Sequence, residues 1–201
     1  DGQISVMGMN FPVSGGFTPI PVAAGAGLGT GSVAHLAVGQ GWTTTIQLIN
    51  SSSAATQAHL RFFDDGGNAL ALPLTLAGSN QTTDLIDPVL PPYSMVTARS
   101  LAPEGSVLLS GSAQLTSEGP LNGFVRFRYE PTGQEIVTPF ETRKTTSYFL
   151  AFDNKGGLAT GVALANMASN DGHVSALIRN TAGVILGVEN ITLPAKGHRS
   201  F

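Results

Sequence analysis

The sequence predicts an all-β protein, and three observations support that fold class. Short β-compatible runs recur roughly every 8–12 residues, separated by turn residues, which is typical of a β-sandwich. Thr and Gly interrupt every stretch whose apolar residues could follow helical spacing. The chain also repeats part of its own sequence. Together these features predict sheets packed face to face rather than alternating helices and strands.

The first predicted strands lie in residues 43–76. In residues 43–50, Ile46 and Leu48 alternate with polar neighbours, so one face of the strand is expected to be buried. Residues 58–63 and 69–76 flank the turn-forming sequence Asp-Asp-Gly-Gly-Asn at residues 64–68, which predicts a hairpin.

The later strands are predicted from the same pattern. Residues 107–115, 124–129 and 135–140 form one group, with a Pro-Thr-Gly turn at residues 131–133 between the last two. Residues 148–152, 160–166, 173–179 and 184–193 form a second group of similar style.

Composition excludes several classes of protein. The 201 residues include only 10 Lys and Arg, and the net charge is −3, so no surface for following a phosphate backbone is expected. No apolar run is long enough for a transmembrane span. There is no Cys, which excludes disulfides and thiolate–zinc sites. A nucleic-acid partner and a membrane span are therefore not expected.

An offset of 116 residues aligns two parts of the chain. Residues 41–50 (GWTTTIQLIN) fall on residues 157–166 (GLATGVALAN), with Gly41, Thr44, Leu48 and Asn50 identical to their mates. After a deletion, Leu90-Pro91 matches Leu193-Pro194. Two copies of one β unit are therefore predicted, starting near Val33 and near Phe149. The second copy lacks a counterpart of residues 99–146.

A second offset, of 118 residues, places residues 4–22 on residues 122–140. Met7, Met9 and Phe11 then meet the apolar residues Val125, Phe127 and Tyr129, and Pro21 meets Pro139. The N-terminal segment therefore resembles the part that the second copy lacks.

The segments GWTTTIQLIN, RFFDDGGNALALPL, LNGFVRFR, TGVALAN and LPAKGHRSF resemble an unnamed repeated module of large secreted bacterial proteins. The resemblance implies immunoglobulin-like sandwiches, an extracellular or cell-surface location and no catalysis, and it supplies no site residues. The order departs from the module, because the closing segment ISVMGMNF…GGFTPIPV stands first here. A strand matching residues 107–116 is also missing from the second copy.

These observations predict four segments. Residues 1–22 form a hairpin that completes a sandwich, in its own chain or in a neighbour. Residues 23–32 form a Gly-rich linker, because the spacing of their glycines departs from the dinucleotide-binding fingerprint. Residues 33–146 form the first immunoglobulin-like sandwich, and residues 147–201 form an incomplete second one.

The function expected from this organisation is structural or adhesive, not enzymatic. Each subunit would donate its N-terminal hairpin to a neighbour's incomplete sandwich, giving a filament or surface array by donor-strand complementation. The assembly interface would then comprise Ile4, Val6, Met7, Met9, Phe11, Phe17, Ile20 and Val22. In one alternative, the chain is a piece of a longer array and residues 4–22 belong to the preceding module. In another, it is a carbohydrate-binding or accessory module of a larger secreted protein, with Trp42 or Tyr93 exposed on a flat face.

Candidate chemistry is sparse, and no cofactor or metal is expected. His35, His59, His173 and His198 form no metal-binding motif, and the nucleophile motifs of hydrolases are absent. Asp64, Asp65 and Asn68 lack the EF-hand pattern and are explained by turn chemistry. Asn50, Asn80 and Asn190 head N-x-[ST] sequons and are candidate glycosylation sites, although chance accounts for such a number.

Overall fold

A computed structural model describes residues 4–11, 18–22, 27–143, 145–157 and 159–201. The predicted all-β class is confirmed: 58% of the described residues lie in strands, the sheets pack together, and no helix occurs in the described ranges. No helix in this part of the chain could therefore cross a membrane. The strands are β1 (Gly8–Asn10), β2 (Thr18–Ile20), β3 (Leu28–Val38), β4 (Trp42–Asn50), β5 (Thr56–Phe63), β6 (Leu72–Leu76), β7 (Ser79–Thr83), β8 (Leu85–Ile86), β9 (Val89–Leu90), β10 (Ser94–Ser100), β11 (Leu109–Tyr129), β12 (Gln134–Pro139), β13 (Ala163–Ala165), β14 (Gly172–Arg179), β15 (Ile185–Leu193) and β16 (His198–Ser200).

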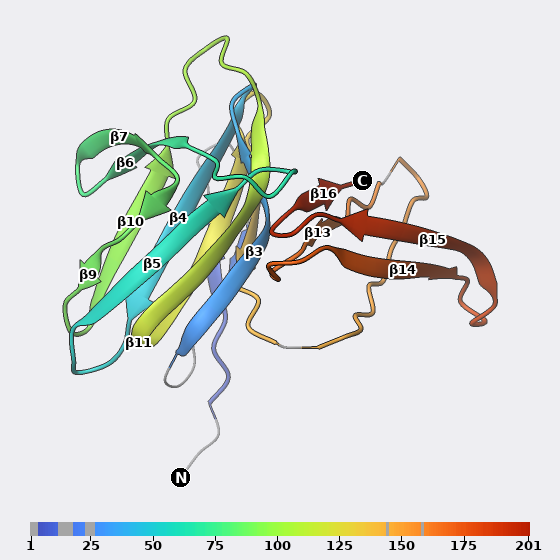
Figure 1. The fold of residues 1–201 in the computed structure, drawn as a ribbon, viewed down its shortest axis with the longest axis horizontal. Helices are drawn as coiled ribbons and strands as arrows, with labels where there is room; N and C mark the ends of the chain where they lie inside the picture. Colours follow the sequence, from blue (N-terminus) through green and yellow to red (C-terminus); the bar gives the residue numbers. More distant parts are fainter. Residues whose placement is uncertain (1–3, 12–17, 23–26, 144, 158) are drawn as a thin grey trace.

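Strand β11 organises the main body of the molecule, a ten-stranded sheet folded back on itself (Figure 1). Its first half pairs with β3 and β5, and its second half pairs with β4 and β12. The sequence predicted separate strands at residues 107–115 and 124–129. They are instead one continuous strand of 21 residues, with register shifts that let it bend from one layer into the other.

The hydrophobic core lies between these layers. Its buried cluster comprises residues between Val33 and Phe140. Ile46 and Leu48 of β4 are each 1% exposed, as their alternation predicted, and Phe62 of β5 is fully buried. Residues 28–140 therefore have a continuous core of their own, and we call them the first unit.

The C-terminal strands form two separate pairs, β13 with β16 and β14 with β15 (Figure 1). We call residues 159–201 the C-terminal unit. It touches the first unit through contacts of β13 and β16 with β3. The strand predicted at residues 148–152 does not form.

The N-terminal residues form the small antiparallel hairpin β1–β2, with Met9 opposite Pro19. Strand β2 lies against β12 of the first unit. The predicted linker is shorter than expected, because β3 begins at Leu28 and residues 28–32 belong to that strand. Residues 23–26 of the linker lie outside the described part of the chain.

Candidate functional site

One asparagine in each unit makes the same set of hydrogen bonds. The Asn50 amide Nδ2 donates to the carbonyls of Ala54, Leu90 and Pro91, at 2.7, 3.1 and 3.0 Å. The Asn166 amide Nδ2 donates to the carbonyls of Asn170, Leu193 and Pro194, at 2.8, 3.3 and 2.9 Å. Every one of these partners is the mate predicted by the sequence alignment.

The backbone around the two asparagines also corresponds. Tyr93 and Lys196 each lie two residues after the matched proline, and both have positive φ, 51° and 61°. The N–H of Tyr93 donates to the Ser52 carbonyl at 3.1 Å, and the N–H of Lys196 donates to the Ala168 carbonyl at 3.0 Å. A residue other than Gly rarely adopts this conformation. Its occurrence at both matched positions therefore indicates that the two turns have the same backbone shape.

Strand registers agree between the units as well. Strand β5 pairs Thr56 with Leu90, and β14 pairs Gly172 with Leu193, which is the same pairing at matched positions. Strand β10 pairs Met95 with Ile49 of β4. At the matched positions, β16 pairs His198 with Ala165 of β13.

The units differ in what flanks these strands. In the first unit, β4 lies between β10 and β11, and β5 also pairs with β11. In the described C-terminal unit, β13 pairs only with β16, and β14 pairs only with β15. No strand of this unit takes the place of β11.

Side-chain burial reflects this difference. Ala58, Leu60 and Phe62 point inward from β5 and are all fully buried. At the matched positions of β14, Val174 and Ala176 are half-buried, and Ile178 is 46% exposed. On β15, Ile191, Glu189 and Gly187 lie opposite these three residues, and Ile191 is only 4% exposed, whereas the exposed Val188 lies opposite Leu177 on the other face. The C-terminal unit therefore has a partly uncovered apolar face.

The N-terminal hairpin presents the complementary feature. Met7, Met9 and Phe11 alternate along the chain and are all exposed, Met7 by 73%, whereas Gly8 and Asn10 between them are half-buried. Of the other predicted interface residues, Ile4, Val6 and Val22 are exposed and Ile20 is half-buried. Phe17 lies outside the described residues. Most of the predicted interface is thus accessible on the single chain.

Polar contacts hold this hairpin on β12. Asn10 Nδ2 donates to Glu135 Oε1 at 2.9 Å, and the Glu135 side chain is only 3% exposed. Burial by itself would raise the pKa of Glu135, but hydrogen bonds from Asn10 and Thr18, together with the charges of Arg126 and Arg128, outweigh it and hold the pKa below its usual value. These contacts give no local sequence signal, because the residues are far apart in the chain.

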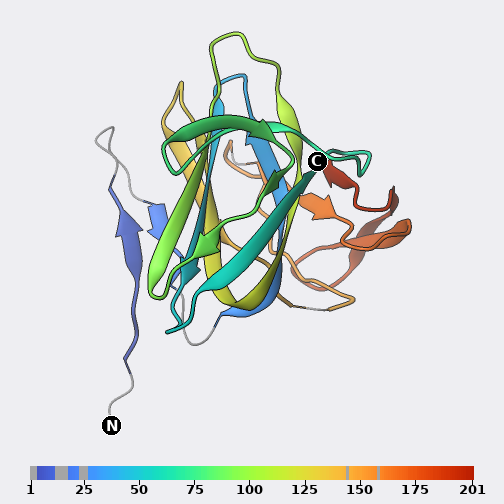
Figure 2. The same cartoon turned by 60° about the vertical axis from the view of Figure 1, so that its left-hand side comes forward.

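The hairpin and the C-terminal unit lie on different sides of the first unit. Figure 2 shows β1 and β2 on one side of the main sheet, while β13–β16 project from the other. One chain therefore presents its exposed hairpin and its uncovered apolar face in different directions.

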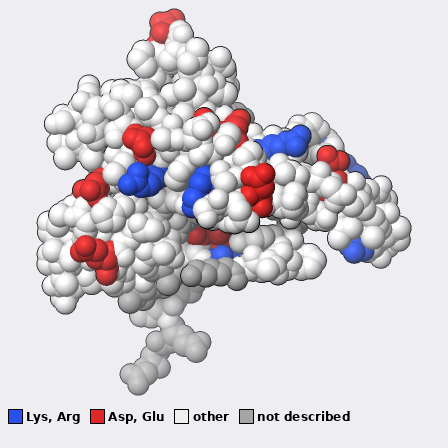
Figure 3. Space-filling model, viewed as in Figure 1, with Lys and Arg blue, Asp and Glu red and all other residues white. Residues whose placement is uncertain are grey.

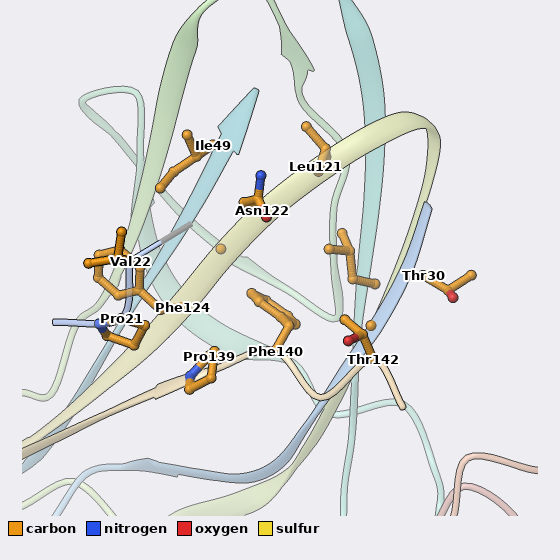
Figure 4. A pocket seen from close by; sticks show the side chains of 13 residues that line it. Pro21, Val22, Thr30, Ile49, Leu121, Asn122, Phe124, Pro139, Phe140 and Thr142 are labelled. Atoms are coloured by element: carbon orange, nitrogen blue, oxygen red, sulfur yellow. The ribbon is translucent and has the colours of Figure 1, made fainter. Parts of the chain in front are cut away.

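A cavity of about 160 Å³ separates the end of the hairpin from the first unit (Figure 4). Pro21 and Val22 line it together with Pro139 and Phe140, their mates at the 118-residue offset. No Asp, Glu, His, Lys, Arg or Tyr lines it, so it offers no acid–base chemistry.

One polar cluster, unpredicted from the sequence, joins the two units. His198 Nδ1 lies 2.7 Å from Asp65 Oδ1, and His198 Nε2 lies 3.1 Å from Nδ1 of His35. His198 is 3% exposed, so it is a buried contact rather than an accessible catalytic base. Burial, and then the neighbouring His198, lower the pKa of His35, against the opposing effect of Asp65.

The remaining histidines and turn residues have structural partners. His59 pairs with Asp87 at 2.6 Å, and His173 Nδ1 lies 3.1 Å from the Thr192 hydroxyl. The Asp64 carboxylate accepts the N–H of Asn68 in the turn after β5, which a single bridge between Phe63 and Ala69 closes. The predicted hairpin does not extend further, because β6 pairs with β10 and β7 and not with β5. Across the described ranges, no cluster of three His, Asp or Glu side chains could hold a metal ion.

The sequons and candidate sugar-binding aromatics occupy different environments. Asn50 is 1% exposed, and its amide is fully engaged, so modification of the folded chain cannot reach it. Asn80 and Asn190 are exposed. Trp42 packs against Tyr129, with ring centroids 5.0 Å apart, whereas Tyr93 is 74% exposed.

Charged side chains are few and scattered on the face shown in Figure 3. No protein family, curated protein or solved structure matches this chain. The features of the chain that bear on function are therefore its two exposed apolar surfaces, one on the hairpin and one on the C-terminal unit.

Proposed function

We propose that this protein is a non-catalytic structural or adhesive subunit that assembles head to tail at the cell surface or outside the cell. Residues 147–201 constitute an incomplete second copy of the first, immunoglobulin-like unit. The N-terminal hairpin of a neighbouring subunit completes it by strand addition.

One observation carries this proposal. The C-terminal unit has the Asn166 hydrogen bonds and strand registers of the first unit, but no counterpart of β11. In the first unit, β11 supplies Val125 and Phe127 to the core, and these are 0% and 6% exposed. Their mates Met7 and Met9 are 73% and 41% exposed. The residues expected to fill a second core are thus present and available.

Physical chemistry favours covering both surfaces. An unpaired strand edge exposes backbone N–H and C=O groups, and contiguous apolar patches are characteristic of interaction surfaces. Burying apolar area yields roughly 25 cal/mol for each Å² removed from water, so pairing the hairpin with the uncovered face would stabilise both.

Light scattering on the full chain tests this function. We expect the weight-average mass of the native protein to rise with concentration. In the double variant Met7→Asp, Met9→Asp it should stay at the monomer mass, because two carboxylates would have to be buried. Circular dichroism should show an unchanged β spectrum, since both residues lie outside the core of the first unit.

Val107→Asp is the matched control, because Val107 is 71% exposed and lies outside the hairpin. It should assemble like the native chain. A native chain that stays monomeric at every concentration would refute the proposed function, as would a double variant that assembles normally.

A further inference from the structure

The matched units also specify how a donated strand would pair. We propose that residues 4–10 of one copy add antiparallel to residues 159–165 of a second copy, with Val6 opposite Ala163. This inference rests on the proposed function. It adds which segment is donated, which edge of the C-terminal unit receives it, and which residues lie opposite each other.

The register is obtained by applying the first unit's pairing to β1 alone, because the β1–β2 hairpin is shifted by one residue relative to β11–β12: Met9 lies opposite Pro19 and not Thr18. In the first unit, β11 pairs with β4 so that Phe124 lies opposite Gln47 and Val125 lies opposite Ile46. Val6 is the residue aligned with Phe124 at the offset of 118 residues, and Ala163 is the residue aligned with Gln47 at the offset of 116 residues. The next pair along then becomes Met7 opposite Val162.

Side-chain chemistry agrees with this register. Val125 and Ile46 are both buried, at 0% and 1% exposed, and form part of the core. At the corresponding positions, Met7 and Val162 are apolar, and both are more exposed than their mates. A slip by one residue would turn Met7 and Met9 to the opposite face of the sheet, away from the core.

The edge that would receive the strand is the side of β13 opposite β16. Among the described residues, β16 is the sole hydrogen-bonded neighbour of β13. Strand β3 lies near β13 but forms no ladder with it. On the donor, β1 has β2 on one side and no paired strand on the other. Neither edge therefore has a hydrogen-bonded partner strand among the described residues.

The position of the hairpin favours a second copy as the donor. Asn10 and Thr18 hold it on β12 through Glu135, while the C-terminal unit projects from another side (Figure 2). Self-closure would require the hairpin to leave Glu135. Donation to a second copy leaves these contacts in place.

Disulfide trapping tests the register, and the chain has no native Cys to interfere. The variant Val6→Cys, Ala163→Cys should form a ladder of intermolecular disulfides on oxidation, because residues opposite each other in a sheet are within disulfide reach. The control Val6→Cys, Ala159→Cys keeps the same face but displaces the acceptor by about 13 Å, beyond disulfide reach. We expect at least a tenfold lower yield of crosslinked oligomers from the control.

The outcomes separate this inference from the proposed function. Equal ladders from both variants, or no ladder from either while light scattering still reports assemblies, would overturn the register but not the assembly. An intramolecular disulfide in the Val6–Ala163 variant would show closure within one chain and overturn the second copy as donor. Absence of assemblies in the native chain would refute the function and this inference together.

Discussion

At the residue scale, single polar side chains organise the ends of the strands. Asn50 and Asn166 are buried, at 1% and 9% exposed, and the amide of each finds its hydrogen-bond acceptors in three backbone carbonyls. Leaving buried polar groups unsatisfied costs roughly 1–3 kcal/mol each. The alignment therefore has Asn at both positions because the amide group makes the same hydrogen bonds to the backbone in both units.

The contact between His35 and His198 makes stability depend on pH. Burial, and then the His198 ring whose Nε2 lies 3.1 Å from Nδ1 of His35, disfavour a second proton on His35. The pKa of His35 is lowered from 6.5 in the folded chain, so the unfolded chain binds its proton first as pH falls. We expect the free energy of unfolding to decrease as pH drops below about 6.5, until His35 is also protonated in the folded state.

Urea unfolding at several pH values measures this effect. His35→Gln should flatten the dependence below pH 6.5, because Gln can donate to His198 without titrating. His173→Gln, at an exposed site, should leave the slope unchanged. An equally steep slope in the His35 variant would show that other groups cause the dependence.

At the element scale, strands with alternating apolar residues were predictable and the others were not. Strands β4, β5, β14 and β15 were located correctly, since Ile46 and Leu48 mark a buried face. Strand β7 has the sequence SNQTT and no apolar residue, so it gave no signal. It forms because its backbone pairs with β6.

The Gly-rich start of β3 shows why composition misled the linker prediction. Glycines usually indicate flexible segments. Here, a Cβ at Gly31 would lie 3.1 Å from Cβ of Phe140, so the small residue lets two strands approach a buried ring. The His35–His198–Asp65 and Asn10–Glu135 contacts were also unpredictable, because they join residues distant in sequence.

Gly123 in β11 provides a test of this close packing. A Cβ there would lie 2.5 Å from the Gln47 carbonyl oxygen and 2.9 Å from the Phe140 ring. Gly123→Ala should therefore lower the free energy of unfolding by about 1–3 kcal/mol. Gly29→Ala is the control, because its nearest atom would be 3.4 Å away, and it should change stability by less than about 0.5 kcal/mol. Equal effects of the two variants in urea unfolding would contradict this packing.

At the scale of the whole molecule, the two units bury their matched side chains to different extents. The first unit has a closed core, whereas the face of β14 is partly open. The mates Phe62 and Ile178 are 0% and 46% exposed. In a dilute, unassembled chain, Phe62 should therefore contribute more to the free energy of unfolding than Ile178 does.

Truncating each side chain measures that difference. Phe62→Ala should cost about 3–5 kcal/mol, because it leaves a cavity in a packed core. Ile178→Ala should cost less than about 1 kcal/mol under dilute conditions, since little apolar area is lost. Denaturant unfolding at low protein concentration is the appropriate measurement. A cost for Ile178→Ala close to that of Phe62→Ala would indicate that the face of β14 is already covered in the single chain.

The separation of hairpin and C-terminal unit on one chain has a consequence for the growth of the proposed assembly. A pair of subunits joined once still has one free donor and one free acceptor, so the dimer is not a preferred end point. Each addition forms the same junction, and the mean length should rise smoothly with concentration, without a nucleation lag. Because every junction has a donor side and an acceptor side, the fibre has a direction. A chain able to donate but not accept would therefore terminate growth at one end only.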